Sequence, residues 1–173
     1  MATTTRRPRR PPMRDATAPA AAPLAILDGG VARIAYRLSW LANFYSGPIY
    51  RRFEMERGLT RPEFVVLHCA VQCPGVTARD IGLMTGLPKN SISRAVQRLL
   101  REGRIARGTD AADARALPLA VTAKGRALYD ELIKPFAARE DQMLAPLSRA
   151  ERAEFDRLLG KLTARTDDWA KIY

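Results

Sequence analysis

The chain contains one histidine, two cysteines and no apolar run long enough to cross a membrane. A membrane-spanning helix needs about 18 consecutive apolar residues, and no stretch approaches that length. His68 has no accompanying Ser or Cys nucleophile, paired carboxylates or Gly-rich phosphate loop, so no catalytic constellation is visible. Together with Cys69 and Cys73 it also supplies too few ligands for a zinc site. We therefore expect neither an enzyme nor a protein with a metal or other cofactor.

Acidic residues are scarce: 18 Asp and Glu stand against 29 Lys and Arg, which gives a formal net charge of +11. Such an excess of positive charge favours a polyanionic partner, first of all nucleic acid. The alternative is a solvated basic surface without a partner. Hydrophobic residues make up 47% of the 173 residues, which suits a globular fold.

The first residues also lead us to expect no export signal. Residues 1–24 are rich in Pro, Arg and Ala, but Asp15, Pro19 and Pro23 interrupt the weakly apolar stretch that a signal peptide would need. We interpret this segment as a disordered basic tail and expect a cytoplasmic protein with reduced cysteines. Cys69 and Cys73 are four residues apart in a predicted helix and poorly placed to bridge. A redox-responsive regulator that uses them remains an alternative.

Helical periodicity dominates the first half of the chain. A long helix is predicted over residues 31–57, with a kink or break at Gly47-Pro48. Its apolar stripe is Val31, Ile34, Leu38, Leu41, Tyr45, Ile49 and Phe53. Thr60 is a plausible N-cap for a second helix, with Pro62 in its first turn. Because "FVVLHCAV" is apolar almost all round, this helix should be central.

Two short helices follow. Thr77 to Asp80 fits a capping box, and the turn Gly86-Leu87-Pro88 leads into "PKNSISRAVQRLLREG". The apolar residues Ile92, Ala95, Val96, Leu99 and Leu100 make one buried face, while the other face is polar and basic. Two short helices joined by a tight turn, the second of them basic, are typical of a helix-turn-helix.

A β-hairpin and two helices complete the pattern. Leu117, Leu119 and Val121 alternate as in a half-buried strand that pairs with residues 104–107, and Pro118 restricts it to an edge or a bulge. Thr122 caps a long helix that should bend near Pro135, and Ser148 opens the last helix. The apolar stripe of that helix is Phe155, Leu158, Leu159, Leu162 and Trp169.

The run "GRIARGTDAADARALPLAVTAKG" resembles the signature of the MarR (multiple antibiotic resistance regulator) family of bacterial winged-helix regulators. The matching positions are Gly103, Ile105, Arg107, Asp113, Arg115, Thr122 and Gly125. "LTRPEFVVL" and "GVTARDIGLMTGLPKNSISRAVQRLLREG" also match. The sequence departs from the pattern at Arg104, where an apolar residue is usual, and at Val121, where Leu is usual.

The resemblance implies a mainly α fold: a winged helix-turn-helix domain with a small β-hairpin wing, plus N- and C-terminal helices that form a helical dimerisation region. On this basis we divide the chain into the tail at 1–24, a dimerisation helix at 25–58, the DNA-binding domain at 59–122 and dimerisation helices at 123–173. The family also implies a homodimer that binds a double-stranded DNA operator as a repressor. The alternative for the terminal helices is that they only cover their own domain.

The basic helix is expected to enter the major groove, with base edges or adjacent phosphates contacted from its N-terminal half. The residues assigned there are Lys89, Asn90, Ser91, Ser93 and Arg94, while Gln97, Arg98 and Arg101 are expected mainly at phosphates. In the wing, the family pattern adds Arg107, Asp113 and Arg115, with the aspartate holding Arg115 for the minor groove. The alternatives are a solvated helix face and an ordinary hairpin salt bridge.

A small-molecule signal is the last expectation. Tyr36, Trp40 and Phe44 form an aromatic stripe beside the packing face of the first helix, and His68 lies on the central helix. By resemblance the inducer pocket lies between the first helices and the DNA-binding lobe, so these four residues are candidate ligand contacts. The positive net charge favours an aromatic carboxylate or phenolic effector. The alternatives are core packing, a non-specific architectural DNA-binding protein, and a small-molecule binder without DNA.

Overall fold

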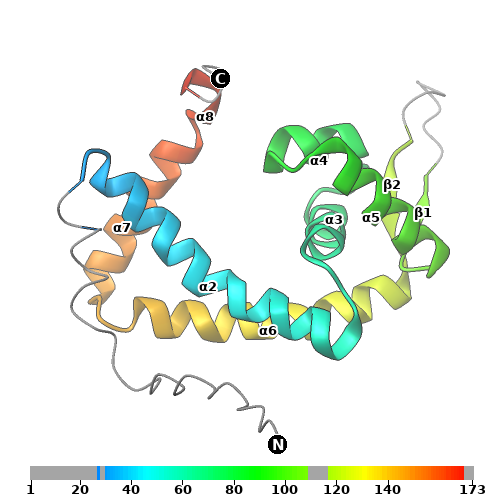
Figure 1. The fold of residues 1–173 in the computed structure, drawn as a ribbon, viewed down its shortest axis with the longest axis horizontal. Coiled ribbons are helices and arrows are strands. Elements are labelled where there is room, and N and C mark those ends of the chain that lie inside the picture. Colours follow the sequence, from blue (N-terminus) through cyan, green and yellow to red (C-terminus); the bar gives the residue numbers. More distant parts are fainter. Residues whose placement is uncertain (1–26, 28–29, 109–116, 170–173) are drawn as a thin grey trace, which may run out of the picture. The chain divides into compact units, whose positions relative to one another are not determined.

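The computed structural model describes residues 27, 30–108 and 117–169 (Figure 1). The chain divides into one compact unit up to Leu41 and a second from Ala42. The elements are α2 (Arg33–Arg57), α3 (Arg61–Gln72), α4 (Ala78–Thr85), α5 (Lys89–Arg101), β1 (Ile105–Arg107), β2 (Leu119–Val121), α6 (Ala123–Leu144), α7 (Arg149–Thr163) and α8 (Thr166–Trp169). Within the described residues, no helix is both long and apolar enough to span a bilayer.

The sequence predicts a kink or a break at Gly47-Pro48. Helix α2 runs unbroken through both residues, so a break is wrong, and a kink stays a prediction. A proline inside a helix lacks the N–H that would bond to the carbonyl four residues earlier, here that of Phe44. The guanidinium of Arg139, on α6, donates to this carbonyl in place of the missing N–H. Its Nε donates to the Phe44 carbonyl oxygen at 3.1 Å and its Nη2 at 2.7 Å. The proline is therefore tolerated because a neighbouring helix satisfies the oxygen that it leaves unpaired.

Helix α3 is the centre of the core, as predicted. Seven of its twelve residues are buried, and Val66 and Leu67 are completely so. The predicted N-cap at Thr60 is confirmed, since the Thr60 N–H donates to Glu63 Oε2 at 2.8 Å. Phe53, from α2, and Phe136, from α6, pack on Phe64, with ring centroids 5.7 and 4.8 Å away. The core thus joins α2, α3 and α6 around one short helix.

The helix-turn-helix is also confirmed. Thr77 and Asp80 form the capping box of α4, and Gly86 ends that helix with a left-handed φ of 66°. Glycine suits this position because it adopts positive φ without steric cost. Helix α5 then buries Ile92, Ala95, Val96 and Leu99 and leaves its polar face outward.

The predicted wing strands pair antiparallel, with Ile105 opposite Val121 and Arg107 opposite Leu119. Leu119 donates its N–H to the Val76 carbonyl at 2.9 Å, which anchors β2 beside the end of α3. Pro118 lies just before β2, where its missing N–H breaks no ladder bond. Asp113 and Arg115 lie outside the described residues.

The predicted caps at Thr122 and Ser148 are confirmed for α6 and α7. Helix α6 is continuous through Pro135. The last helix is shorter than predicted, because α7 ends at Thr163 and Trp169 falls in the separate short helix α8. No residue of α7 is buried, and Leu158 and Leu162 are 45% and 56% exposed.

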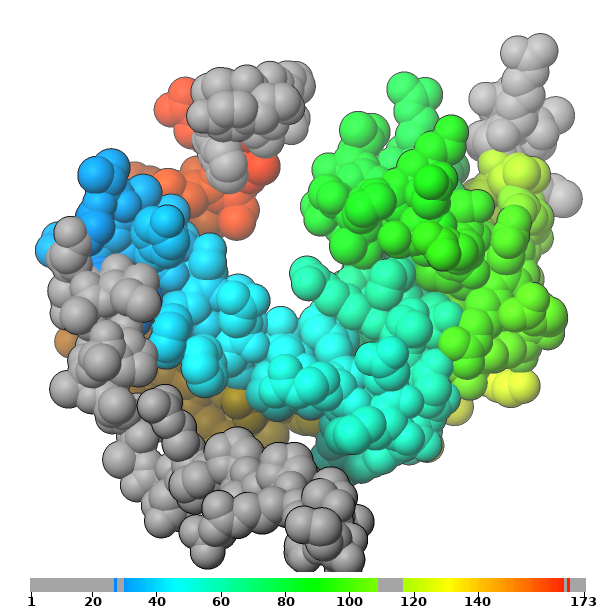
Figure 2. Space-filling model, viewed as in Figure 1, coloured from blue at the N-terminus to red at the C-terminus, as the bar shows by residue number. Residues whose placement is uncertain are grey.

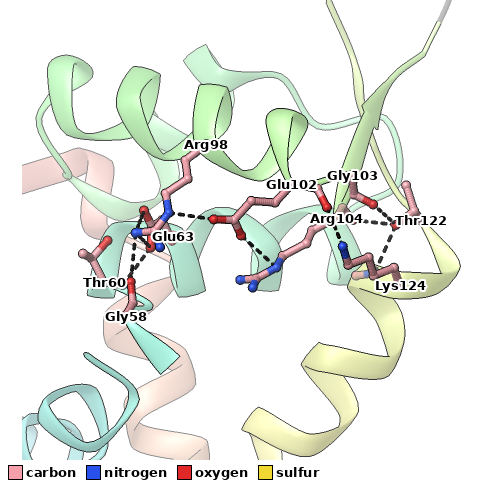
Figure 3. A network of polar contacts seen from close by, with 10 residues as sticks. Gly58, Thr60, Glu63, Arg98, Glu102, Gly103, Arg104, Thr122 and Lys124 are labelled. Atoms are coloured by element: carbon pink, nitrogen blue, oxygen red, sulfur yellow. Dashed lines mark hydrogen bonds and ion pairs between the residues drawn. The ribbon is translucent and has the colours of Figure 1, made fainter. Parts of the chain in front are cut away.

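Arg98 joins α5 to the start of α3 (Figure 3). Its Nη1 donates to the Gly58 carbonyl at 2.8 Å and lies 3.0 Å from Glu63 Oε1. Glu63 is only 5% exposed and is the one buried charged residue in the described part of the chain. A buried carboxylate is costly unless it is paired and hydrogen-bonded. Glu63 meets both conditions through Arg98 and the Thr60 N–H.

The same network continues from α5 to the wing. Arg98 Nε donates to Glu102 Oε1 at 2.8 Å, and Arg104 Nε forms an ion pair with the buried Glu102 Oε2 at 3.0 Å that lacks hydrogen-bond geometry. Burial opposes the charge on Glu102, but the hydrogen bond from Arg98 and the charge of Arg104 outweigh it and lower its pKa. This pairing accounts for an arginine at position 104, where the family resemblance predicts an apolar residue.

The start of α6 crosses directly over the root of β1. Thr122 Oγ1 donates to the carbonyls of Gly103 at 2.8 Å and Arg104 at 3.0 Å, and a Cβ added to Gly125 would overlap the Arg104 carbonyl. Position 125 therefore has room only for glycine.

We expect Gly125→Ala to lower the free energy of unfolding by about 3 kcal/mol or more, because backbone must move to admit the methyl group. Gly160→Ala is the matched control, since nothing lies within 4 Å of its added Cβ on α7. That change should stabilise the protein by about 0.5–1 kcal/mol through helix propensity. Urea unfolding of both variants provides the measurement, and equal effects would contradict the close approach at position 125.

We expect Arg98→Met to lower the free energy of unfolding by about 1.5–3 kcal/mol, because it leaves the buried Glu63 carboxylate without its charged partner. Arg52→Met is the control: Arg52 pairs with Glu56 on the exposed side of α2, 2.9 Å apart. Its loss should cost less than about 0.5 kcal/mol. If urea unfolding gives similar values for both variants, the Arg98 network does not stabilise the fold as described.

Candidate nucleic-acid interface and apolar cavity

The outward face of α5 is polar and basic along its whole length. Helix α5 contains no acidic residue, and Arg94 is held along the helix by a bond from its Nε to the Asn90 carbonyl at 3.3 Å. Six of the predicted contact residues on α5 are exposed, and Ser91 is half-buried. The exposed ones are Lys89, Asn90, Ser93, Arg94, Gln97 and Arg101. A rigid helix with this face is suited to contact phosphates and base edges.

A wide groove runs between α4, α5 and the wing strands, with a volume of about 930 Å³. The surfaces of these elements adjoin in the green region of Figure 2. The groove brings together four of the predicted residues, namely Lys89, Ser93, Gln97 and Arg107. It also contains Arg79, which sequence reasoning did not single out although it is an exposed basic residue in the first turn of α4.

The acidic side chain that lines the groove is hydrogen-bonded within α4 and its cap. Asp80 lines it, but its carboxylate accepts bonds from the Thr77 hydroxyl at 2.8 Å and the Thr77 N–H at 3.0 Å. The hydroxyl bond is the main reason that the pKa of Asp80 is lowered. This carboxylate is therefore committed to the α4 cap, while the cations around it remain exposed.

Arg98 differs from the other predicted contacts. Its guanidinium is bound to Gly58, Glu63 and Glu102, and its side chain is 34% exposed. We therefore revise the expectation of a phosphate contact: the geometry favours a structural role in holding α5. The sequence pattern could not reveal this, because the partners at 58 and 63 are brought close only by the fold.

A second cavity, of about 400 Å³, lies between α2, α3 and α6. Its walls are mostly aromatic, and they include only one of the four predicted ligand contacts, His68. The lining residues are Tyr45, Tyr50, Phe64, Val65, His68, Ile133, Phe136, Ala137 and Glu140. Apolar periodicity in the sequence indicates that the tyrosines and phenylalanines of this wall face inward. It does not distinguish residues that line a cavity from residues of the packed core.

The other three predicted contacts are placed differently. Phe44 is 56% exposed and is not part of the cavity wall. Tyr36 and Trp40 belong to the unit that ends at Leu41, where Tyr36 is 54% exposed and Trp40 is half-buried. A ligand contact by these three residues stays a prediction.

His68 is oriented by a hydrogen-bonded tyrosine. Its Nδ1 lies 3.1 Å from the Tyr129 hydroxyl, which also accepts a bond from Gln72 Nε2 at 2.9 Å. Burial lowers the pKa of His68, so the ring is neutral at pH 7. His68 is thus hydrogen-bonded within the core and also lines the cavity, so a ligand contact by this residue stays a prediction.

The two cysteines differ in environment. Both thiols are free; Cys69 is buried and Cys73 is exposed. Burial, followed by the neighbouring Cys73, raises the pKa of Cys69. A thiol with a raised pKa is a poor nucleophile, which argues against Cys69 as a redox sensor.

Comparison with known proteins agrees with this architecture. Residues 57–116 match the sequence pattern of the MarR family. The HTH-type transcriptional repressor Rv2887 of Mycobacterium tuberculosis is 32% identical over 105 residues, which are 61% of this chain and 76% of that relative.

Solved structures of such regulators are similar as well. The PcaV transcriptional regulator of Streptomyces coelicolor, in complex with its natural ligand, aligns with a TM-score of 0.60 and 28% identity over 84% of this chain and 96% of that one. Rv2887 with salicylic acid aligns with a TM-score of 0.60 and 27% identity over 78% and 97% of the two chains. Its complex with DNA gives a TM-score of 0.60 and 27% identity over 76% and 98%. The relatives are transcriptional regulators rather than enzymes, and this chain belongs to the MarR family of winged helix-turn-helix transcriptional regulators.

Proposed function

We propose that this MarR-family regulator binds a pseudo-palindromic double-stranded DNA operator as a homodimer, represses transcription from it and is released by a small aromatic ligand. The observation that carries the proposal is the outward face of α5, which contains Lys89 and Arg94 but no acidic residue, while Arg98 fixes the helix from behind. The relative Rv2887, which has been solved with DNA, supports the same partner.

Within this proposal the residues of α5 divide by position. Arg94 is suited to fork onto guanine, and Asn90 or Gln97 to pair with adenine. Arg101 and Arg107 contact phosphates, which hold the helix in register without reading sequence. In the wing, Arg115 enters the minor groove and Asp113 orients it. Arg79 joins the phosphate contacts because it lines the same groove.

A homodimer is supported by apolar surface at both ends of the chain. In the first unit, Val31 and Ile34 are 94% and 70% exposed, and on α7 Leu158 and Leu162 are 45% and 56% exposed. Side chains of this kind gain stability when a second copy covers them. A two-fold axis would then place two α5 helices about 34 Å apart, one turn of the DNA helix.

The ligand part of the proposal is supported by the cavity of about 400 Å³ that His68 lines. Apolar walls with a few polar groups are typical of small-molecule sites. Rv2887 has been solved with salicylic acid, a small aromatic compound. A ligand releases DNA only to the extent that it prefers the non-binding conformation, commonly by about 1–3 kcal/mol.

Selection from random double-stranded DNA with the purified full-length protein tests the main proposal. We expect an inverted repeat of about 16–20 base pairs. An architectural DNA-binding protein would show a steep salt dependence without a preferred sequence, and a small-molecule binder without DNA would recover nothing. Either of those outcomes would overturn the proposal.

On the selected operator, we expect Arg94→Ala to weaken binding by about 1–3 kcal/mol and to relax the preference at one base pair. Arg52→Ala is a control with the same change of net charge on the exposed side of α2, and its effect should be small. Fluorescence anisotropy at moderate salt gives both affinities. Equal losses would show that Arg94 acts only through net charge and would refute its assignment to a base.

Charged residues on the α7 stripe should prevent dimerisation. We expect Leu158→Asp and Leu162→Asp each to weaken the dimer by about 1.5–3 kcal/mol, because each replaces a leucine that the partner would bury. Ala153→Asp, also exposed on α7 but on the opposite side, is the control. Sedimentation equilibrium measures the dimer population, and unchanged dimers in both leucine variants would place the interface elsewhere.

A further inference from the structure

The charge of the aromatic cavity is opposite to that of the whole chain. Glu140 is the only charged side chain among the residues that line it, although the chain carries a net charge of +11. The positive charge that led us to expect an acidic effector lies on residues that do not line this cavity, including those of α5 and its groove. The ligand's charge must therefore be judged from the groups that face the cavity.

The walls supply aromatic faces. Phe64 and Phe136 stack with ring centroids 4.8 Å apart, and Tyr50 meets Phe64 edge-on at 5.9 Å. Tyr45 adds a fourth ring, 5.8 Å from Phe136. These surfaces accept a flat aromatic ring, and the faces of tyrosine rings also attract cations.

His68 offers one hydrogen-bond donor. Because the Tyr129 hydroxyl accepts from Gln72 Nε2, the simplest arrangement has that hydroxyl donate its own proton to His68 Nδ1. The proton of the neutral imidazole then lies on Nε2, which leaves an N–H donor on a residue of the cavity wall. This donor suits a neutral oxygen such as that of a phenol.

Glu140 supplies a negatively charged hydrogen-bond acceptor at the edge of the cavity, where it is exposed to solvent. After burial, its negative charge is the next cause that raises the pKa of Tyr45, so its field extends to the wall. Two arginines of the neighbouring helices do not line the cavity and make other contacts. Arg139 donates to the Phe44 carbonyl. Arg61 lies over the Tyr50 ring, 5.5 Å from its centroid, where its charge offsets part of the rise in the pKa of Tyr50 that burial causes.

We propose that this cavity selects an aromatic amine that carries a phenolic oxygen, with the ammonium at Glu140 and the oxygen at His68, and discriminates against aromatic carboxylates. The inference rests on the proposed ligand-released function and specifies its ligand class. A carboxylate placed here would lose its hydration, would meet no cationic side chain among the described residues that line the cavity, and would be repelled by Glu140. This distinguishes the chain from its relative Rv2887, which has been solved with salicylic acid.

Three probes of similar size and different charge test the proposal: tyramine, 4-ethylphenol and 3-(4-hydroxyphenyl)propionate. Isothermal titration calorimetry with the full-length protein at pH 7 should give the order tyramine, then 4-ethylphenol, then the acid. We expect at least about a fivefold difference in Kd between the first and the last, the scale of a partly exposed ion pair. Tighter binding of the acid, or no binding of any probe, would overturn the proposal.

Substitutions at position 140 then test the cause of the order. Glu140→Gln should weaken tyramine and leave 4-ethylphenol unchanged, and Glu140→Lys should reverse the order of tyramine and the acid. Asp141→Asn removes the same charge from the neighbouring exposed residue of α6, which does not line the cavity, and should change nothing. An equal response of Glu140→Gln and Asp141→Asn would refute a specific contact at Glu140.

Operator binding is measured separately, so that the two proposals can fail independently. If tyramine binds in the predicted order but the operator affinity stays unchanged, the cavity assignment holds and ligand-controlled release is wrong. If the operator is bound and no probe is, the DNA-binding proposal holds and the ligand class is wrong. His68→Phe should weaken tyramine and 4-ethylphenol alike by removing the shared donor, and an unchanged affinity for both would refute the role of His68.

Discussion

The contact between Arg98 and the buried carboxylate of Glu63 is the interaction on which the DNA-facing part of the molecule depends. It attaches the back of α5 to the first turn of α3, and through Glu102 and Arg104 it continues to the first strand of the wing. A recognition helix can read DNA only if its position is fixed to a fraction of an ångström, since a bidentate contact tolerates little displacement. The polar network adds directional contacts to the apolar packing of α5 on the core.

Local signals in the sequence were sufficient for most of the architecture. The capping boxes at Thr77 and Ser148 depend on residues three apart, and the left-handed glycine at 86 depends on one residue, so they can be read without a fold. The buried face of α5 likewise follows from periodicity alone. The outcome differed at Gly47-Pro48, where the local rule predicts a kink or a break. The helix is continuous there, and a distant arginine on α6 bonds to the carbonyl that the proline cannot pair with.

The candidate site was predictable only in part, because some of its contacts join residues that are far apart in the sequence. Exposed basic residues on α5 can be recognised from their spacing, but the engagement of Arg98 with positions 58 and 63 depends on how two helices pack. The cavity wall combines residues from three separate helices, and its single charge at Glu140 cannot be inferred from a net charge of +11. Summed charge describes attraction at long range, whereas a ligand responds to the few groups within contact.

Helix α3 has neighbouring residues in two different roles. Phe64 is part of the cavity wall, and Glu63, one peptide bond away, holds the guanidinium behind α5. The two side chains leave the same turn of α3 for different contacts. A rotation or axial shift of α3 would therefore displace the cavity wall and the partner of Arg98 together. Helix α3 is also the most completely buried helix in the described part of the chain, so close packing resists a local rearrangement of either side chain. The wall of the cavity and the anchor of α5 thus lie on consecutive residues of one buried helix.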